Sequence, residues 1–239
     1  MEYTSLKQQL ANKGYAITKP LFNAAEIDAI LRHVSEVDPA KPTFRKTADL
    51  FAIRQFLKEI PDLQPLLFKP AFNALVQELL GKNAFLVKSI YFDKPEQSNW
   101  FVAYHQDLTI SVDQKIDREG FGPWTVKQNQ FAVQPPLTIL ENNLTIRIHL
   151  DDTTESNGAL KVIPGSHRRG VYRPEAIDWQ QEMEEICPVT SGAVMLMKPL
   201  LLHASNRTTN QQRRRVIHLE FSNEPLPEPL QWSEQCFPF

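Results

Sequence analysis

The stretch LTIRIHL, residues 144–150, alternates apolar and polar side chains along its whole length. The apolar positions are Leu144, Ile146, Ile148 and Leu150, and the polar positions between them are Thr145, Arg147 and His149. Successive side chains of a β-strand point to opposite faces of a sheet, so this alternation predicts a strand with one apolar face and one polar face. The fold is therefore expected to contain a sheet that presents polar groups on one side.

The same two-residue period recurs throughout the part of the chain that follows residue 84. Six segments rich in β-branched and aromatic residues are expected to form strands: AFLVKSIYF (84–92), NWFVAYHQDLTISV (99–112), LTIRIHL (144–150), ALKVI (159–163), AVMLMKPLLLH (193–203) and RVIHLEFSN (215–223). Two long connections, over residues 112–143 and 166–190, separate some of them. Connections of that length are expected to be functional segments.

Residues 1–82 read instead as a mainly helical region. Asn23, with a glutamate three positions later, predicts a capping box at the start of a helix over residues 24–37. The segment ADLFAIRQFLKEI (48–60) predicts a second helix. A third is expected over residues 70–80, with a proline in its first turn and a glycine directly after it.

Helices beside short antiparallel strands indicate an α+β fold whose core is a sandwich or barrel, with a jelly-roll as the leading candidate. We expect a single domain over residues 1–239. Within it, residues 1–82 form the helical flank, residues 83–223 the jelly-roll core and residues 224–239 a C-terminal tail.

Bulk properties exclude several classes of protein. The formal net charge of −2 provides no general attraction for nucleic acid, and no apolar run is long enough to span a bilayer. The N-terminal residues lack the pattern of a secretory signal. Cys187 and Cys236 do not indicate a disulfide framework. We therefore expect a cytoplasmic protein without a membrane or nucleic-acid partner.

His105 and Asp107 lie two positions apart in the expected strand over residues 99–112. Side chains at this spacing share a face, so an imidazole nitrogen and a carboxylate oxygen would lie side by side as two metal ligands. A second histidine from a distant strand would complete the two-histidine, one-carboxylate triad of iron(II) oxygenases. Spacing alone does not select this pair, because it recurs as His149 with Asp151 and as His218 with Glu220.

His203 ends another expected strand, and three consecutive arginines precede the strand after it. An arginine at the start of a strand can bind a dicarboxylate through two parallel hydrogen bonds. Strand alternation places Arg214 on the opposite face from Arg213 and Arg215. A solvated basic edge, which discourages pairing with another strand, accounts for at least two of the three.

Taken in order, these segments resemble the phytanoyl-CoA dioxygenase family of iron(II)- and 2-oxoglutarate-dependent oxygenases. The resemblance rests on NWFVAYHQDLTI (99–110), GFGPWTVKQ (120–128), LTIRIHLDD (144–152), GALKVIPGSH (158–167) and LLLHASNRTTNQQRRRVIHLEF (200–221). The N-terminal GYAITKPLFNAAEIDAI (14–30) is similar to the opening helical region of that family. The likeness thus covers nearly the whole chain and implies a double-stranded β-helix, a cupin-like form of the jelly-roll.

The resemblance also implies a set of site residues. It makes His105, Asp107 and His203 the ligands of Fe(2+). Arg214 and Ser205 would bind the distal carboxylate of 2-oxoglutarate, the co-substrate used together with O2.

Lys88 and Trp124 occupy places where relatives contact the co-substrate or roof the site. Arg214 is chosen as the arginine that binds 2-oxoglutarate because it follows His203 by about eleven positions, as in the family. The choice could be wrong by one residue, so Arg213 and Arg215 stay open as alternatives.

The expected reaction is hydroxylation of a small-molecule metabolite with release of succinate and CO2, by a monomer or homodimer. Halogenases built on related sites lack the carboxylate ligand, so Asp107 argues for hydroxylation. In this reading Arg147 or His149 lines the pocket or is a satisfied polar group. A zinc-dependent hydrolase and a non-catalytic jelly-roll that binds a small molecule are the two alternatives.

Overall fold

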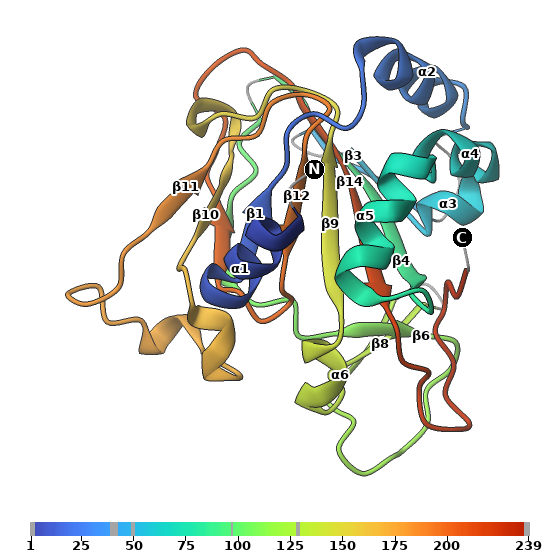
Figure 1. The fold of residues 1–239 in the computed structure, drawn as a ribbon, viewed down its shortest axis with the longest axis vertical. Helices are drawn as coiled ribbons and strands as arrows, with labels where there is room; N and C mark the ends of the chain where they lie inside the picture. Colours follow the sequence, from blue (N-terminus) through green and yellow to red (C-terminus); the bar gives the residue numbers. More distant parts are fainter. Residues whose placement is uncertain (1–2, 39–42, 49–50, 97, 128–129, 237–239) are drawn as a thin grey trace.

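An antiparallel sheet of seven strands runs through the computed structural model, which describes residues 3–38, 43–48, 51–96, 98–127 and 130–236. In spatial order its strands are β1 (Tyr15–Ile17), β12 (Val194–Met197), β9 (Leu144–His149), β14 (Arg214–Ser222), β4 (Phe85–Lys94), β3 (Phe51–Arg54) and β2 (Phe44–Lys46). Figure 1 shows β9 and β14 at the centre of this sheet, with the N-terminal strand β1 beyond β12.

Two smaller sheets complete the β-structure of the described residues. The first contains β11 (Glu185–Cys187), β10 (Leu160–Val162), β13 (His203–Ser205) and β5 (Val102–His105), in that spatial order. The second contains β6 (Ile110–Val112), β8 (Gln130–Val133) and β7 (Trp124–Lys127). The main sheet and the four-stranded sheet form the α+β double-stranded β-helix that the sequence predicts. The expected single domain and its internal boundaries stay a prediction.

Helices from the first third of the chain cover the outer face of the main sheet. They are α1 (Tyr3–Lys13), α2 (Ala24–Ser35), α3 (Phe56–Glu59), α4 (Gln64–Leu67) and α5 (Pro70–Leu80). One more α-helix, α6 (Leu137–Glu141), lies much later in the described chain. Short 3-10 helices span Pro61–Leu63, Glu155–Asn157, Ser166–Arg169 and Pro174–Ala176. In Figure 1, α2 to α5 lie together on one side of the sheet, and β10 and β11 lie on the other.

The predicted start of α2 and both predicted ends of α5 are confirmed, whereas α2 ends at Ser35, two residues before the predicted end. Asn23 accepts a hydrogen bond from the Glu26 amide, and the Glu26 side chain accepts one from the Asn23 amide, so the capping box is complete. Helix α5 has Pro70 in its first turn and ends at Gly81, whose φ of 89° is readily adopted only by glycine. Local signals therefore set these two helices.

The alternation of β9 decides where the polar groups lie. Leu144, Ile146 and Ile148 belong to the apolar core that also contains Ile30 and Leu75 of the helices. The intervening Thr145, Arg147 and His149 are also buried, but they face away from the helices, toward the space between the two main β-layers. The β-helix thus has a polar interior, which is where a site can form.

The helix expected over residues 48–60 is wrong in its first part. Residues 51–54 form strand β3, and only Phe56–Glu59 are helical, while residues 49 and 50 lie outside the described part of the chain. The strand pairs with β4, with Ile53 opposite Tyr91. The free edge of β4 offers backbone hydrogen bonds that no single-sequence propensity contains, and this tertiary pairing overrides the helical pattern.

Two expected strands are each divided in the structure. Residues 99–112 form β5 and β6, with residues 106–109 outside both, and residues 193–203 form β12 and the start of β13. Pro199, which cannot donate to a ladder, lies in the second break. The connections expected over residues 112–143 and 166–190 likewise carry structure, because the first contains β7, β8 and α6 and the second contains β11.

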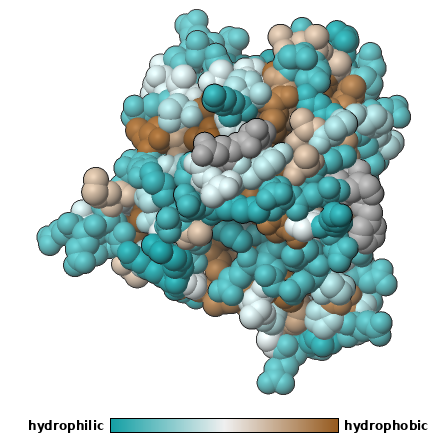
Figure 2. Space-filling view, in the orientation of Figure 1, coloured by the Kyte–Doolittle hydropathy of each residue, from teal (hydrophilic) through white to brown (hydrophobic). Residues whose placement is uncertain are grey.

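The surface in Figure 2 is hydrophilic over most of the face drawn, with apolar residues in small separate groups. Among the described residues, none of the helices combines the length and the apolar character needed to cross a bilayer.

The C-terminal segment is anchored by a buried carboxyl group. Glu234 is 4% exposed and accepts hydrogen bonds from the backbone amide and the hydroxyl of Ser89 on β4. Burial raises the pKa of Glu234 to about 7, against the lowering effect of these two hydrogen bonds. The folded protein therefore holds a proton there at a pH at which an ordinary glutamate is ionised.

This proton makes folding stability depend on pH in a defined direction. The unfolded chain releases it near the ordinary pKa of 4.5 and the folded chain near 7, so raising the pH through this window favours unfolding. Relative to Glu234→Gln, the wild type is expected to lose up to about 3 kcal/mol of unfolding free energy between pH 4.5 and 7. Urea denaturation at several pH values measures the difference, and a constant difference across the window would contradict the buried protonated state.

Candidate active site

Two histidines from distant parts of the chain face each other across one pair of strands. Strand β13 pairs with β5 in a register that places His203 opposite His105. Directly opposed residues of an antiparallel pair share a face, and the two imidazole ring centroids lie 4.2 Å apart. Strand register thus brings the two rings together.

Asp107 joins this pair from outside the strand, so the expectation that His105 and Asp107 share a strand face is wrong. Strand β5 ends at His105, and the Asp107 amide donates to the Pro199 carbonyl at 2.9 Å. The side chain of Gln106 donates to the carbonyl oxygens of Gly170 and Leu200. These bonds to two other segments hold the chain after the strand, and a turn places the carboxylate beside the imidazoles.

The three side chains have the geometry of a metal centre. One ligand atom from each of His105, Asp107 and His203 lies within 4.8 Å of the others. The Nε2 atoms of both histidines are 3.9 Å from carboxylate oxygens of Asp107. Each histidine Nδ1 lies within hydrogen-bond distance of a backbone carbonyl, that of Ala103 at 2.9 Å and that of Leu201 at 3.0 Å. With Nδ1–H donating to the carbonyl, Nε2 keeps a lone pair for a metal.

The donor atoms also have the right protonation for a cation. Burial lowers the pKa of His203 to about 4. Burial alone would raise the pKa of Asp107, but the fields of His203, His218 and Lys88 outweigh it and lower the pKa to about 2. Its Oδ2 is buried without a hydrogen-bond partner among the described residues. An unsatisfied anionic oxygen beside the Nε2 atoms of two imidazoles fits a divalent metal ion.

A cavity of about 140 Å³ adjoins the three ligands and contains two buried arginines. Arg147 of β9 and Arg214 of β14 both line it, and the Nε atom of each has no hydrogen-bond partner among the described residues. Burial lowers the pKa of Arg147 to about 10 and, with the charge of Arg147, that of Arg214 to about 9. Both stay charged at neutral pH. Two cations in one small cavity fit a dianion such as 2-oxoglutarate.

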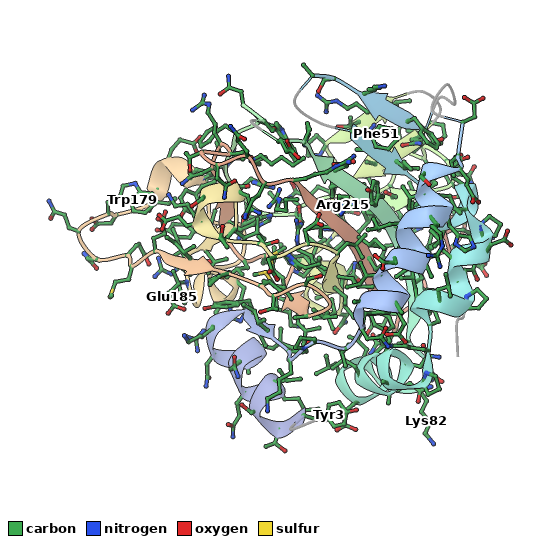
Figure 3. The ribbon with its side chains drawn as sticks, turned by 90° about the horizontal axis from the view of Figure 1, so that it is seen from above. Tyr3, Phe51, Lys82, Trp179, Glu185 and Arg215 are labelled. Atoms are coloured by element: carbon green, nitrogen blue, oxygen red, sulfur yellow. The ribbon has the colours of Figure 1, made fainter. Side chains whose placement is uncertain are left out.

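The three consecutive arginines have different surroundings. Arg213 forms a double hydrogen bond with Asp93, and Arg215 forms one with Asp151. Arg213 is half exposed while Asp93 is buried, and Arg215 and Asp151 are each partly exposed; Figure 3 shows Arg215 on its strand. Arg214 is 3% exposed and lines the cavity, on the opposite face from Arg213 and Arg215 as strand alternation predicts. Its neighbours are neutralised by carboxylates, so Arg214 alone of the three is available to a ligand there.

Ser205 lies beside Arg214 in the same cavity. Its hydroxyl donates to the Gly158 carbonyl at 2.9 Å, and the Arg214 guanidinium donates to the same oxygen. Gly158 has a φ of 87°, and a β-carbon there would lie 2.7 Å from the Lys94 Nζ. The backbone therefore approaches these groups closely only because residue 158 is glycine.

Lys88 and Trp124 lie elsewhere. Lys88 forms an ion pair with Glu220 at 2.9 Å, on the same face of the sheet as the cavity but outside its lining. Trp124 is on β7 and packs against a separate apolar cluster that contains Val133 and Leu140. Their expected contact with the co-substrate stays a prediction.

The two rival histidine pairs have structural partners instead. His149 Nδ1 lies 2.7 Å from the Thr153 hydroxyl, and Asp151 is occupied by Arg215. His218 Nε2 lies 3.0 Å from Glu220, which also binds Lys88. In the described residues, only the group around His105 brings three metal-binding side chains together.

Several cavity residues escaped prediction from the sequence. Phe92, Trp100, Val102 and Leu160 supply apolar lining, and His218 contacts Arg147 at 3.3 Å and also lines the cavity. Arg147 also lines the cavity, so of the two residues expected either to line the pocket or to be satisfied polar groups, Arg147 takes the first role. The alternation of β4 and β14 could have placed Phe92 and His218 on the inner face of the sheet. Only the fold shows which end of each strand lies near the metal-binding side chains.

A double-stranded β-helix with this ligand triad, next to a cationic cavity, defines the iron- and 2-oxoglutarate-dependent oxygenases as a class. Within that class the chain belongs to the phytanoyl-CoA dioxygenase (PhyH) family, whose model matches residues 10–216. It is an Fe(II)- and 2-oxoglutarate-dependent dioxygenase, so the zinc-hydrolase and non-catalytic alternatives are set aside.

Individual relatives are distant in sequence. The chain is 23% identical over 250 residues to a protein of Stutzerimonas stutzeri named "Probable alpha-ketoglutarate-dependent hypophosphite dioxygenase", covering 92% of this chain and 78% of that protein. EctD from S. alaskensis shares the fold at a TM-score of 0.71 and 19% identity, over 93% of this chain and 78% of EctD. HygX from Streptomyces hygroscopicus, solved with nickel, 2-oxoglutarate and hygromycin B, has a TM-score of 0.65 and 15% identity, over 91% and 86% of the two chains.

The ligand assignment predicts a selective loss of metal binding. His105→Ala or His203→Ala removes one of three ligands, and we expect Fe(II) affinity to fall by about 100-fold or more, because even outer partners of a site cost about 10- to 100-fold. Anaerobic calorimetric titration measures the affinity. His149→Ala is the matched control and should bind Fe(II) within about threefold of the wild type. Loss of binding in the control alone would overturn the assignment.

Proposed function

We propose that this chain hydroxylates a small-molecule metabolite, with His105, Asp107 and His203 as the iron ligands and Arg214 as the main anchor of 2-oxoglutarate. One oxygen atom of O2 enters a C–H bond of the metabolite, and the other enters succinate as 2-oxoglutarate loses CO2. The observation that carries the proposal is the juxtaposition of the metal-binding triad with two buried arginines to which the described residues offer no carboxylate partner.

The cavity supports binding of 2-oxoglutarate in one orientation. Arg214, with the Ser205 hydroxyl beside it, receives the distal carboxylate, because a guanidinium fork matches a carboxylate in two parallel hydrogen bonds. Arg147 adds a second positive charge between Arg214 and the metal ligands. The keto and proximal carboxylate groups then point to the triad, where bound iron supplies the redox chemistry of the reaction.

Apolar side chains restrict water at this centre. Phe92 and Trp100 pack against each other with ring centroids 6.1 Å apart, and Val102 and Leu160 complete the apolar lining. Exclusion of water protects a strongly oxidising site from side reactions and strengthens the attraction between the arginines and a dianion.

The carboxylate of Asp107 favours hydroxylation over halogenation, because it takes the ligand position that a halide would need. A small-molecule substrate agrees with HygX, which was solved with hygromycin B bound. The expected state, monomer or homodimer, stays a prediction.

Succinate formation tests the proposal. We expect purified protein with Fe(II), 2-oxoglutarate and O2 to release succinate slowly without substrate and faster with a suitable metabolite. Addition of Zn(II) should inhibit by replacing iron. Absence of O2-dependent succinate under every condition, with Fe(II) bound, would contradict the proposed activity.

The role of Arg214 predicts a specific defect in co-substrate binding. Arg214→Met removes a charged hydrogen-bonding group worth about 1.5–3 kcal/mol, so the dissociation constant of 2-oxoglutarate should rise about 10- to 150-fold. Anaerobic titration of the Fe(II)-loaded protein measures this. Arg215→Met is the control: Asp151 keeps the hydrogen bond from the Arg215 amide, and 2-oxoglutarate affinity should be unchanged. An equal effect in both variants would contradict the assignment.

A further inference from the structure

A second and larger cavity, of about 530 Å³, lies beside the metal centre. Its lining combines the end of β3, the start of α3, the middle of β4, the small sheet of β6, β7 and β8, and the C-terminal segment. The lining residues that matter below are Arg54, Lys58, Lys88, Ile90, Asp113 and Glu234. None of the functions assigned so far uses this space.

The large cavity and the metal cavity follow each other along the same strand. Ile90 of β4 lines the large cavity, and Phe92, the next residue on that face, lines the metal cavity. Likewise, Thr109 lines the large cavity, and Asp107, two residues earlier in the chain, lines the metal cavity. A molecule in the large cavity would therefore lie next to the metal centre.

Hydrogen bonds also connect the two cavities. Lys88, which lines the large cavity, binds Glu220, and Glu220 is 3.0 Å from His218. His218 lines the metal cavity and contacts Arg147. The positive charge of Lys88 is thus balanced by Glu220, and it does not by itself call for an anionic ligand.

Two other cations of the large cavity lack such a balance. Among the residues that the structure describes, none forms a hydrogen bond or ion pair with the Arg54 guanidinium. Within the described part of the chain, the Lys58 ammonium has one hydrogen bond, to the Ser233 carbonyl, and no ion pair, although its charge lowers the pKa of Glu234 to some extent. Cationic groups that line a cavity without a carboxylate partner favour an anionic ligand.

The acidic groups of the same lining do not cancel these charges. Glu234 accepts hydrogen bonds from the amide and hydroxyl of Ser89. Burial raises its pKa to about 7, so it is partly protonated at neutral pH. Asp113 is exposed and accepts a hydrogen bond from the Gln231 amide. The cavity therefore has an excess of positive charge on the side formed by β3 and α3.

The backbone between the two cations is strained. Gln55 has a φ of 51°, and it is the one non-glycine residue in the described chain with a positive φ. Its carbonyl accepts from the amides of Lys58 and Glu59, so this conformation ends β3 and starts α3. A left-handed residue that is not glycine costs about 1 kcal/mol or more, and such strain is concentrated at functional sites. Here it turns the chain so that Arg54 and Lys58 line one cavity.

The lining also indicates a polar ligand. Its apolar members are Ile90, Val112, Phe131 and Ala132, and its other members carry polar or charged side chains. A long acyl chain requires an apolar channel, which this lining does not provide.

We propose that the large cavity binds the primary substrate, and that this substrate is a small polar molecule with an anionic group, a carboxylate, sulfonate or phosphorus oxyanion, held by Arg54 and Lys58. This inference rests on the proposed hydroxylase function. The anionic group anchors one end of the molecule at β3 and α3, and the opposite end reaches past Ile90 toward the metal ligands.

The experiment compares charged probes with neutral ones on the Fe(II)- and 2-oxoglutarate-loaded protein. The probes are N-acetylglycine, methanesulfonate and methylphosphonate, paired with the uncharged N-acetylglycinamide, methanesulfonamide and dimethyl methylphosphonate, respectively. Binding is followed anaerobically by saturation-transfer NMR, which needs no turnover, and stimulation of succinate release is followed in air. We expect at least one anion to bind and its neutral partner to bind about tenfold or more weakly.

Variants then locate the anion. Arg54→Gln and Lys58→Met should each weaken binding of the anionic probe about 10- to 100-fold. Arg45→Gln and Lys82→Met are matched controls on exposed positions, and Figure 3 shows Lys82 at the edge of the molecule, far from Phe51 of β3. Both controls should bind the probe as the wild type does.

The outcomes separate this inference from the proposed function. Lack of anion binding, equal binding of neutral partners, or binding that survives in both cavity variants would overturn the inference even when succinate is formed. Anion binding that depends on Arg54 and Lys58, in a protein that forms no succinate, would support the anion site and contradict the hydroxylase function.

Discussion

The antiparallel pairing of β5 with β13 is the interaction on which the functional centre depends. Its register sets His203 opposite His105, and the breaks in the chain after His105 and at Pro199 bring Asp107 beside them. A shift of one residue would turn one histidine to the other face of the sheet, so the centre is only as well defined as this register. The main sheet stabilises the register by covering the other side of the same interior.

The arginines around this pair of strands differ in burial and in whether a carboxylate neutralises them. Arg213 and Arg215 are neutralised by carboxylates near the surface, whereas Arg147 and Arg214 are buried without one. Burying two unpaired cations is costly, and a bound dianion would offset that cost, so co-substrate binding and stability of the fold are linked. The ion pair between Lys88 and Glu220 lies between the residues of this cavity and those of the larger one, where no described residue pairs with the Arg54 guanidinium.

The features predicted correctly from the sequence are those with a local cause. The capping box at Asn23 needs only neighbouring residues, and strand alternation correctly placed Arg214 on the opposite face from Arg213 and Arg215. The features predicted wrongly depend on distant partners. Residues 51–54 form a strand because they pair with the edge of β4. Asp107 lies outside the strand because its amide donates a hydrogen bond to the Pro199 carbonyl.

The sequence by itself determined helices α2 and α5 and the polar face of β9, and through the resemblance of ordered segments it determined the family and predicted three metal ligands. It left His105 with Asp107 equal to two similar pairs on spacing alone. Only the tertiary structure decided that His149 would bind Thr153, that His218 would bind Glu220, and that neighbouring residues of β4 would line two cavities. The physical reason is that ligand geometry and cavity charge depend on strand register and on contacts between remote segments, which local patterns do not encode.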